Sequence, residues 1–226
     1  MCIPNQGVMI MLKKISCALI IAAAAGGMVF AGENNDLRSL FLKNKANICG
    51  INLRTFNAKD INGNEIIDEG EAGGNFLNAI ERLDEIQNLG INVLHVLPIT
   101  PVGRLKALGT AGSVYAAEDF WSINPQLVDK NSNLSDIEQA KKFINECHKR
   151  NIRVIIDLPS CGAYDLFLTH PELFIKDSRQ CSIVPTDWTD VRLLNTGTNK
   201  RLNQDVLDTH KRFVNVVLEL GADGIR

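Results

Sequence analysis

The fold is decided by the stretch Asn92-Val93-Leu94-His95-Val96-Leu97-Pro98. Its apolar residues do not alternate with polar ones, which is typical of a strand covered on both faces. Proline cannot donate to a sheet, so Pro98 ends the strand, and His95 is expected to be a hydrogen-bonded core residue. Upstream, apolar residues recur at helical spacing from Phe76 to Leu89 and stop at Gly90. A helix followed by a buried strand predicts an α/β unit.

The same unit recurs along the chain. Ser135 and Glu138 stand three residues apart at the start of an apolar-periodic segment, where each side chain can cap the other's amide. A further periodic segment ends at Gly221, a typical helix terminus. The expected strands are 48–53, 92–97, 153–158 and 222–226, and the expected helices are 76–89, 135–147 and 206–220.

Strand–helix units in series imply a parallel sheet with right-handed crossovers. A doubly wound sheet would usually carry a glycine-rich phosphate loop after its first strand, and residues 54–57 contain no glycine. A (β/α)8 barrel places its active-site loops at the carboxyl ends of the strands, where the loops of this chain are longest and most polar. We therefore predict an α/β fold that is a partial (β/α)8 barrel, with about the first four strands and three helices.

Composition excludes several classes of protein. The 226 residues are 45% hydrophobic and carry a formal net charge of −2, which favours a folded core over disorder. No basic block is present to hold a phosphate backbone, so nucleic acid is not an expected partner. Cysteines 49, 147, 161 and 181 show no C-x-x-C spacing, so neither a zinc site nor a redox pair is indicated.

The amino end has the features of an export signal. Two lysines precede the apolar run 15–31, and no acidic residue occurs before Glu33. This pattern predicts a signal peptide at 1–31, cleaved after Ala31, and a secreted or periplasmic protein made of residues 32–226 without a stable membrane anchor. The alternative is a membrane anchor through 15–31, a run at the short limit of a bilayer span.

A loop downstream of the first strand has the spacing of a calcium site. Oxygen-bearing side chains occupy the first, third, fifth and ninth positions of an EF-hand-like loop, and the seventh can offer a carbonyl. Glu71 stands at the twelfth position, whereas Glu65 departs from the glycine usual at the sharp turn. The alternative is a solvated polar turn. The candidate Ca²⁺ ligands are Asp60, Asn62, Asn64, Ile66 and Asp68.

Four motifs follow one another around the expected strand ends: Gly90 to Ile99, Tyr115 to Phe120 with Ile123 to Pro125, Val154 to Asp157, and Gly221 to Arg226. In order and spacing they resemble the α-amylase family of glycoside hydrolases, over roughly residues 48–226. The stretch 187–195 is similar to the small loop domain that this family carries after the third strand. We therefore expect residues 159–204 to form such a domain.

The resemblance implies retaining hydrolysis or transglycosylation of α-glucans or related oligosaccharides. It places three residues against substrate: Tyr115 as the aromatic that stacks on the sugar, Asp157 as the strand-end aspartate that orders the site, and Arg226 as its ion partner. Asp119 corresponds to a structural aspartate of the same loop. One departure is that the family has Asn-His where residues 161–162 are Cys-Gly.

The resemblance also bears on catalysis. The family places its nucleophilic aspartate two residues after the arginine that Arg226 matches, and its acid/base glutamate after the fifth strand. Both carboxylates would then lie beyond Arg226, so the chain is expected to be a truncated amino-terminal half-barrel that is inactive alone. It could pair with a complementary carboxyl-terminal half. The alternative is a non-catalytic carbohydrate-binding or interaction protein of the same fold.

Overall fold

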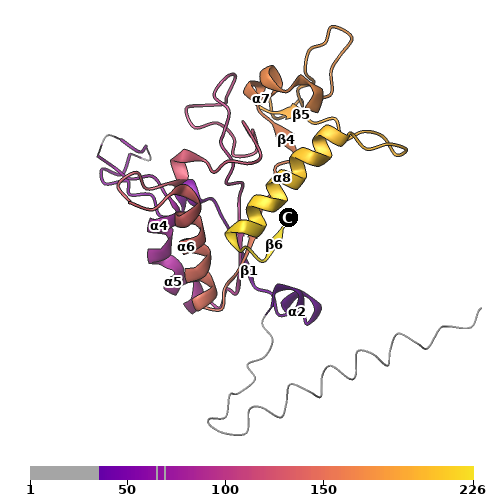
Figure 1. Ribbon diagram of the computed structural model, residues 1–226. Coiled ribbons are helices and arrows are strands. Elements are labelled where there is room, and N and C mark those ends of the chain that lie inside the picture. The colour runs from indigo at the N-terminus through magenta and orange to yellow at the C-terminus, as the bar shows by residue number, and fades with distance from the viewer. Residues whose placement is uncertain (1–35, 65, 69) are drawn as a thin grey trace, which may run out of the picture. The chain divides into compact units, whose positions relative to one another are not determined.

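The computed structural model describes residues 36–226 except 65 and 69 (Figure 1). The predicted signal peptide, residues 1–31, and the alternative anchor at 15–31 lie outside the described residues. Within the described part of the chain, none of the helices combines the length and the apolar character needed to span a bilayer.

Four parallel strands form the main sheet and follow chain order across it. Ile51 lies opposite Val96, and Val96 lies opposite Ile156, so the strands are in register at their carboxyl ends. Parallel neighbours need a crossover between them, and each crossover here contains a helix. The predicted α/β fold with a parallel sheet is confirmed. The strands are β1 (Ile48–Ile51), β2 (Val93–Val96), β3 (Arg153–Ile156) and β6 (Gly224–Ile225).

The crossover helices begin and end close to the predicted positions. Ser135 Oγ accepts a hydrogen bond from the Glu138 N–H, and Glu138 accepts one from the Ser135 N–H, which confirms the predicted capping box. Gly221 ends the last helix with a φ of 81°, in the left-handed region that favours glycine. The single helix expected at 76–89 is divided by a 3-10 turn. The elements are α4 (Phe76–Ala79), η1 (Ile80–Arg82), α5 (Leu83–Asn88), α6 (Asp136–Lys149) and α8 (Gln204–Leu220).

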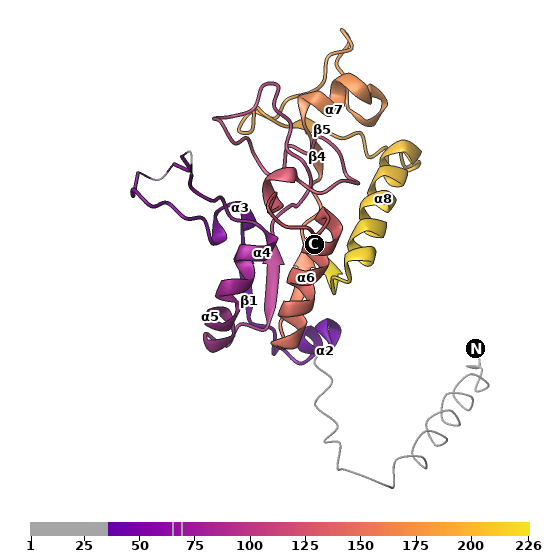
Figure 2. The same cartoon turned by 60° about the vertical axis from the view of Figure 1, so that its left-hand side comes forward.

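The helices cover one face of the sheet and form the core with it. Leu94, Val96, Val154 and Ile156 point to this face and are at most 2% exposed. They share one apolar cluster with side chains of α4, α5, α6 and α8, and Figure 2 shows α4, α6 and α8 beside the sheet. Burial of this apolar surface is the main force that holds the crossovers in place.

Shorter elements connect and extend this framework. Within 159–204, β4 pairs antiparallel with β5, and α7 and η3 lie between them in the chain. Figures 1 and 2 show α7, β4 and β5 beyond the carboxyl ends of the main strands. That 159–204 is a domain in its own right stays a prediction. The remaining elements are α2 (Leu37–Leu42), α3 (Leu53–Phe56), η2 (Pro125–Leu127), β4 (Cys161–Gly162), α7 (Tyr164–Thr169), η3 (Pro171–Leu173) and β5 (Arg192–Leu193).

Two leucines at either end of α5 test the packing of the crossover helix. Leu83 is 0% exposed and Leu89 is 69% exposed. We expect Leu83→Ala to lower the free energy of unfolding by about 2–5 kcal/mol, because it leaves a cavity in the core. Leu89→Ala should change it by less than about 0.5 kcal/mol. Urea unfolding followed by circular dichroism measures both, and equal losses would show that this face of α5 is not buried.

Candidate functional site

A buried carboxylate organises the carboxyl edge of the sheet. Asp157 directly follows β3, and its side chain is 2% exposed. Its Oδ2 accepts a hydrogen bond from the Tyr115 hydroxyl at 2.6 Å and one from Arg226 Nη1 at 2.7 Å. A carboxylate that is buried without partners loses its hydration at a large cost in free energy. Hydrogen bonds and an opposite charge, as here, offset that cost. The structure thus brings together the three residues predicted to face substrate, whereas their contact with substrate stays a prediction.

His95 is a fourth member of this group. Its Nε2 lies 3.3 Å from Asp157 Oδ2, within ion-pair distance. The geometry is not that of a hydrogen bond, and Nε2 is buried without a hydrogen-bond partner among the described residues. The prediction of a hydrogen-bonded core residue is therefore wrong. His95 pairs with Ile155 across the sheet. It therefore shares a face with Asp157, which lies two residues after Ile155. Strand register places the two side chains together, and no local sequence pattern shows it.

The carboxylate keeps one oxygen available. The contacts from Tyr115, Arg226 and His95 all fall on Oδ2 of Asp157, and no described residue donates to its Oδ1. An ionised carboxylate accepts on both oxygens. The site can therefore accept a further hydrogen bond from a ligand hydroxyl.

The loop that carries Tyr115 is held by the segment after β3. The Tyr115 N–H donates to Ser113 Oγ at 3.2 Å, and the Ser113 N–H donates to Asp190 Oδ2 at 3.0 Å. Asp190 is 2% exposed. Sequence reasoning missed both Ser113 and Asp190, because no local pattern links residues 77 positions apart.

Charge and burial set the protonation of the site. Burial raises the pKa of the Tyr115 phenol, and the hydrogen bond to Asp157 and its negative charge raise it further, while Arg226 acts in the opposite direction. The Asp157 carboxylate, through its charge and its hydrogen bond, raises the pKa of Arg226. At neutral pH the phenol is therefore a proton donor and the guanidinium is charged.

The other residues singled out by the resemblance are structural. Asp119 accepts hydrogen bonds from the N–H groups of Trp121 and Ser122 and from the Ser122 hydroxyl, all within its own loop. At Gly162 an added Cβ would lie 2.6 Å from Phe174 Cζ. Phe174 therefore fills the space that a side chain at this position would need.

The predicted calcium loop is tied together by its own side chains. The Nδ2 groups of Asn62 and Asn64 both donate to Asp68 Oδ2 at 2.8 Å, and these bonds lower the pKa of Asp68. Asp60 Oδ1 accepts from the Gly63 N–H, and the Ile66 N–H donates to Asn64 Oδ1.

Whether this loop fits a metal ion depends on which of its oxygen atoms can serve as ligands. Glu71 Oε1 accepts from the N–H groups of Ile61 and Asn62, so the twelfth-position carboxylate also closes on the loop. Among the described residues no three His, Cys, Asp or Glu side chains are grouped to hold a metal ion. A site here would need the amide oxygens of the asparagines and a peptide carbonyl, which are ligands that Ca²⁺ accepts.

The four described cysteines are free thiols: Cys49, Cys147, Cys161 and Cys181. Burial raises the pKa of the Cys147 thiol to about 12. That thiol is therefore an apolar core group rather than a nucleophile.

Parts of this chain are similar in sequence to known proteins. No protein-family model matches the chain. A cyclomaltodextrinase from a Bacillus species is 34% identical over 85 residues, which cover 38% of this chain and 13% of that protein. Alpha-amylase 2 from Dictyoglomus thermophilum is 34% identical over 99 residues, which cover 44% of this chain and 15% of that protein. Over these stretches the chain is similar to members of the α-amylase family.

Solved structures agree with this relationship. An alpha-amylase from Lactobacillus plantarum matches with 27% identity and a TM-score of 0.57, over 75% of this chain and 36% of that one. The maltogenic alpha-amylase AmyB from Thermotoga neapolitana matches with 25% identity and a TM-score of 0.59, over 79% and 38%. The resemblance to the α-amylase family is thus confirmed, and this chain spans well under half the length of those relatives.

The hydrogen bond between Tyr115 and Asp157 predicts a titration. The chain has two tyrosines, so Tyr164→Phe leaves Tyr115 as the sole phenol. In that background we expect Tyr115 to titrate above pH 10.0, its ordinary pKa, and Asp157→Asn to lower its pKa, because the negative charge is removed. The stability from the protonated phenol is present below the ordinary pKa and is lost as pH rises through the raised one. Ultraviolet absorbance of the phenolate measures the shift.

Asp119→Asn is the control for this titration, because it removes a carboxylate from the same loop that does not contact Tyr115. It should leave the pKa of Tyr115 unchanged. An unchanged or higher pKa in Asp157→Asn would contradict the geometry of the site.

Proposed function

We propose that this chain forms the α-glucan-binding part of a retaining glycoside hydrolase or transglycosylase. The observation that carries the proposal is the convergence of Tyr115, Asp157 and Arg226 at the carboxyl edge of the sheet. The relatives reported above are named as an alpha-amylase and a cyclomaltodextrinase, which supports an α-glucan as the substrate class. The alternative of a non-catalytic binding or interaction protein is not favoured by these relatives.

The architecture supports a partial barrel. Four parallel strands in chain order, with their crossover helices on one face, have the arrangement of the first half of a (β/α)8 domain. Active sites of such barrels lie at the carboxyl ends of the strands, and this is the edge that holds Asp157. A complementary half of the barrel is the partner that this arrangement would take.

Each site residue has a role in holding a sugar. The partly exposed ring of Tyr115 offers an apolar face to the C–H groups of a pyranose. Asp157 Oδ1 accepts from a sugar hydroxyl, while the Arg226 guanidinium donates to Oδ2 and holds the carboxylate in place.

Retaining hydrolysis requires two carboxyl groups about 5–5.5 Å apart, one as nucleophile and one as acid/base. Here Asp157 is held by Tyr115 and Arg226 in an ordering role. We therefore propose that this stretch binds glucan and that the complementary half supplies turnover. The export signal at 1–31 and a secreted or periplasmic location belong to the same proposal.

Binding of maltoheptaose to the purified chain tests this function. We expect Tyr115→Ala to weaken binding about tenfold, or about 1.4 kcal/mol, because the stacking face is lost. Tyr164→Ala removes the other tyrosine, whose ring lies against Lys106 and Arg192, and should leave binding unchanged. Calorimetry measures both affinities. If the chain does not bind maltoheptaose, the proposal is wrong. If the chain alone releases reducing sugar, the part of the proposal that assigns turnover to the complementary half is wrong.

The calcium loop is proposed as a structural site. Asp60, Asn62, Asn64, Ile66 through its carbonyl, and Asp68 would hold the ion, which would neutralise the carboxylates and fix the loop. The support is the spacing of the oxygen-bearing side chains and the closeness of Asn62 and Asn64 to Asp68, to which their amide nitrogens donate. The ion would have no part in the chemistry at Asp157.

Thermal unfolding after chelator treatment tests the calcium site. Calcium at about 100 times its Kd should stabilise the folded chain by about 2.7 kcal/mol and raise its Tm. Asp68→Ala should abolish this rise, because it removes the carboxylate on which both asparagines converge. The exposed Asp187 serves as the control, and Asp187→Ala should keep the rise. An equal rise in Asp68→Ala would show that calcium binds elsewhere.

A further inference from the structure

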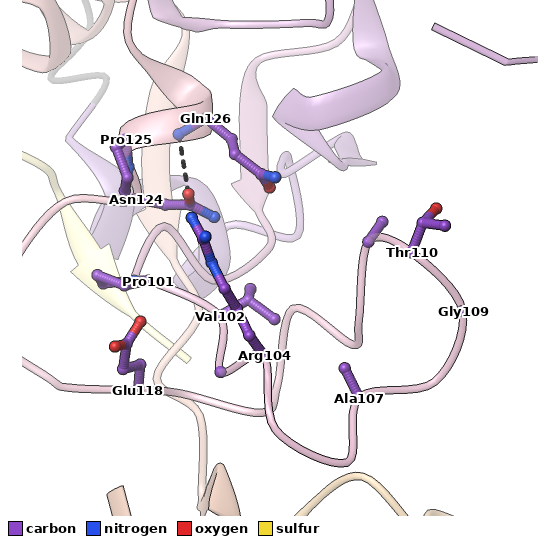
Figure 3. Close-up of a pocket in the computed structure, with 12 residues that line it drawn as sticks. Pro101, Val102, Arg104, Ala107, Gly109, Thr110, Glu118, Asn124, Pro125 and Gln126 are labelled. Carbon is purple, nitrogen blue, oxygen red and sulfur yellow. Dashed lines mark hydrogen bonds between the residues drawn. The ribbon is translucent and has the colours of Figure 1, made fainter. Parts of the chain in front are cut away.

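A separate pocket of about 420 Å³ lies in the loops that follow β2 (Figure 3). Its walls are residues 101–104, 107 and 109–111, Glu118 and residues 124–126, and it includes none of Tyr115, Asp157 and Arg226. Its volume is within the range of about 300–1,000 Å³ that small-molecule sites occupy. The glucan site described above makes no use of it.

Asn124 presents unmet donors to this pocket. The residue is 3% exposed, and its Oδ1 accepts the Gln126 N–H at 2.9 Å. That bond identifies which end of the amide is oxygen, so Nδ2 is the end with two free N–H donors. No described residue accepts from Nδ2, and Figure 3 shows it on the side of the amide away from the dashed bond. Nδ2 is not among the described polar atoms that are fully buried without a partner, so it reaches the open pocket and is free to donate to a ligand there.

Arg104 brings a second set of donors to the same pocket. Its guanidinium is always charged and carries five N–H groups. The guanidinium forms no hydrogen bond or ion pair with any residue in the described part of the chain. Figure 3 shows the Arg104 side chain extending toward the Asn124 amide. Arg104 is exposed, so water meets its donors in the free protein, and a ligand acceptor can replace that water at both donor groups. Phosphate and carboxylate groups match a guanidinium in two parallel hydrogen bonds.

Glu118 adds a hydrogen-bond acceptor to the pocket. Its backbone N–H is held by the Pro101 carbonyl at 2.8 Å, and its carboxylate lines the pocket without forming an ion pair to Arg104. A carboxylate accepts hydrogen bonds and repels a second anion, so hydroxyl groups of a ligand suit this side of the pocket.

We propose that this pocket binds a small hydroxylated molecule bearing an oxyanion, of the class of sugar phosphates and sugar acids. Arg104 and Asn124 would donate to the oxyanion, and Glu118 would accept from the hydroxyls. The proposal uses other residues than the glucan site, so each can fail without the other.

Calorimetric titration of the full chain with glucose 6-phosphate, gluconate and glucose tests the proposal. We expect at least one of the two anions to bind, and neutral glucose to bind at least tenfold more weakly than that anion. The anion that binds identifies the oxyanion as phosphate or carboxylate. Equal affinity for glucose, or binding of neither anion, would overturn the proposal.

Two variants separate the donors from the fold. Asn124→Asp keeps the oxygen that accepts the Gln126 N–H and replaces the donors with a second acceptor. Arg104→Gln changes an exposed side chain and leaves the core intact. Each should weaken anion binding more than tenfold, with circular dichroism unchanged. Wild-type affinity in Arg104→Gln, or in a folded Asn124→Asp, would overturn the proposal.

Lys106→Gln is the matched control. Lys106 is a cation in the same loop, but it does not line the pocket, and its Nζ lies 3.8 Å above the Tyr164 ring. Its substitution should keep the affinity within twofold. A loss as large as that in Arg104→Gln would show that the anion responds to the general charge of the loop, and this would also overturn the proposal.

Discussion

Asp157 places a carboxylate inside the protein at the end of β3, where its side chain is 2% exposed. A carboxylate in this position is stable only if charged or polar groups replace the water it has lost. The Tyr115 hydroxyl and the Arg226 guanidinium do so at 2.6 and 2.7 Å. They come from the loop after β2 and from the residue after β6, so one buried charge ties three neighbouring strands together at their carboxyl ends.

The same requirement explains the order in the long loops around the site. Tyr115 reaches Asp157 because its backbone is held by Ser113, and Ser113 is held in turn by the buried Asp190. Asp190 belongs to the segment between β3 and α8. The shape of the candidate site is therefore set jointly by the sheet and by this segment, and a change in either should alter the position of the Tyr115 side chain.

The two polar regions differ in how their hydrogen bonds are met. At Asp157 one oxygen is satisfied by protein groups and the other is left to a ligand. At Asn124 the oxygen is satisfied and the nitrogen is not, and Arg104 beside the same pocket also has no acceptor. One region therefore offers an acceptor and the other offers donors, so they suit different chemical groups of a ligand.

Local sequence patterns determined most of the framework. The apolar run at 92–97 predicted β2, the pair Ser135 and Glu138 predicted the start of α6, and Gly221 predicted the end of α8. These features depend on neighbours within one turn of helix or one strand, so periodicity and capping suffice to find them. The resemblance to a known family identified Tyr115, Asp157 and Arg226, which composition and periodicity alone would not have singled out.

Contacts between distant residues were decided by the tertiary structure. Tyr115 and Arg226 lie 42 and 69 positions from Asp157, and only the parallel sheet brings them to one carboxylate. The position of His95 beside Asp157 and the filling of the space at Gly162 by Phe174 depend on strand register and side-chain packing. A sequence pattern records which groups each segment carries, whereas the partners of a buried group depend on which segments meet in space.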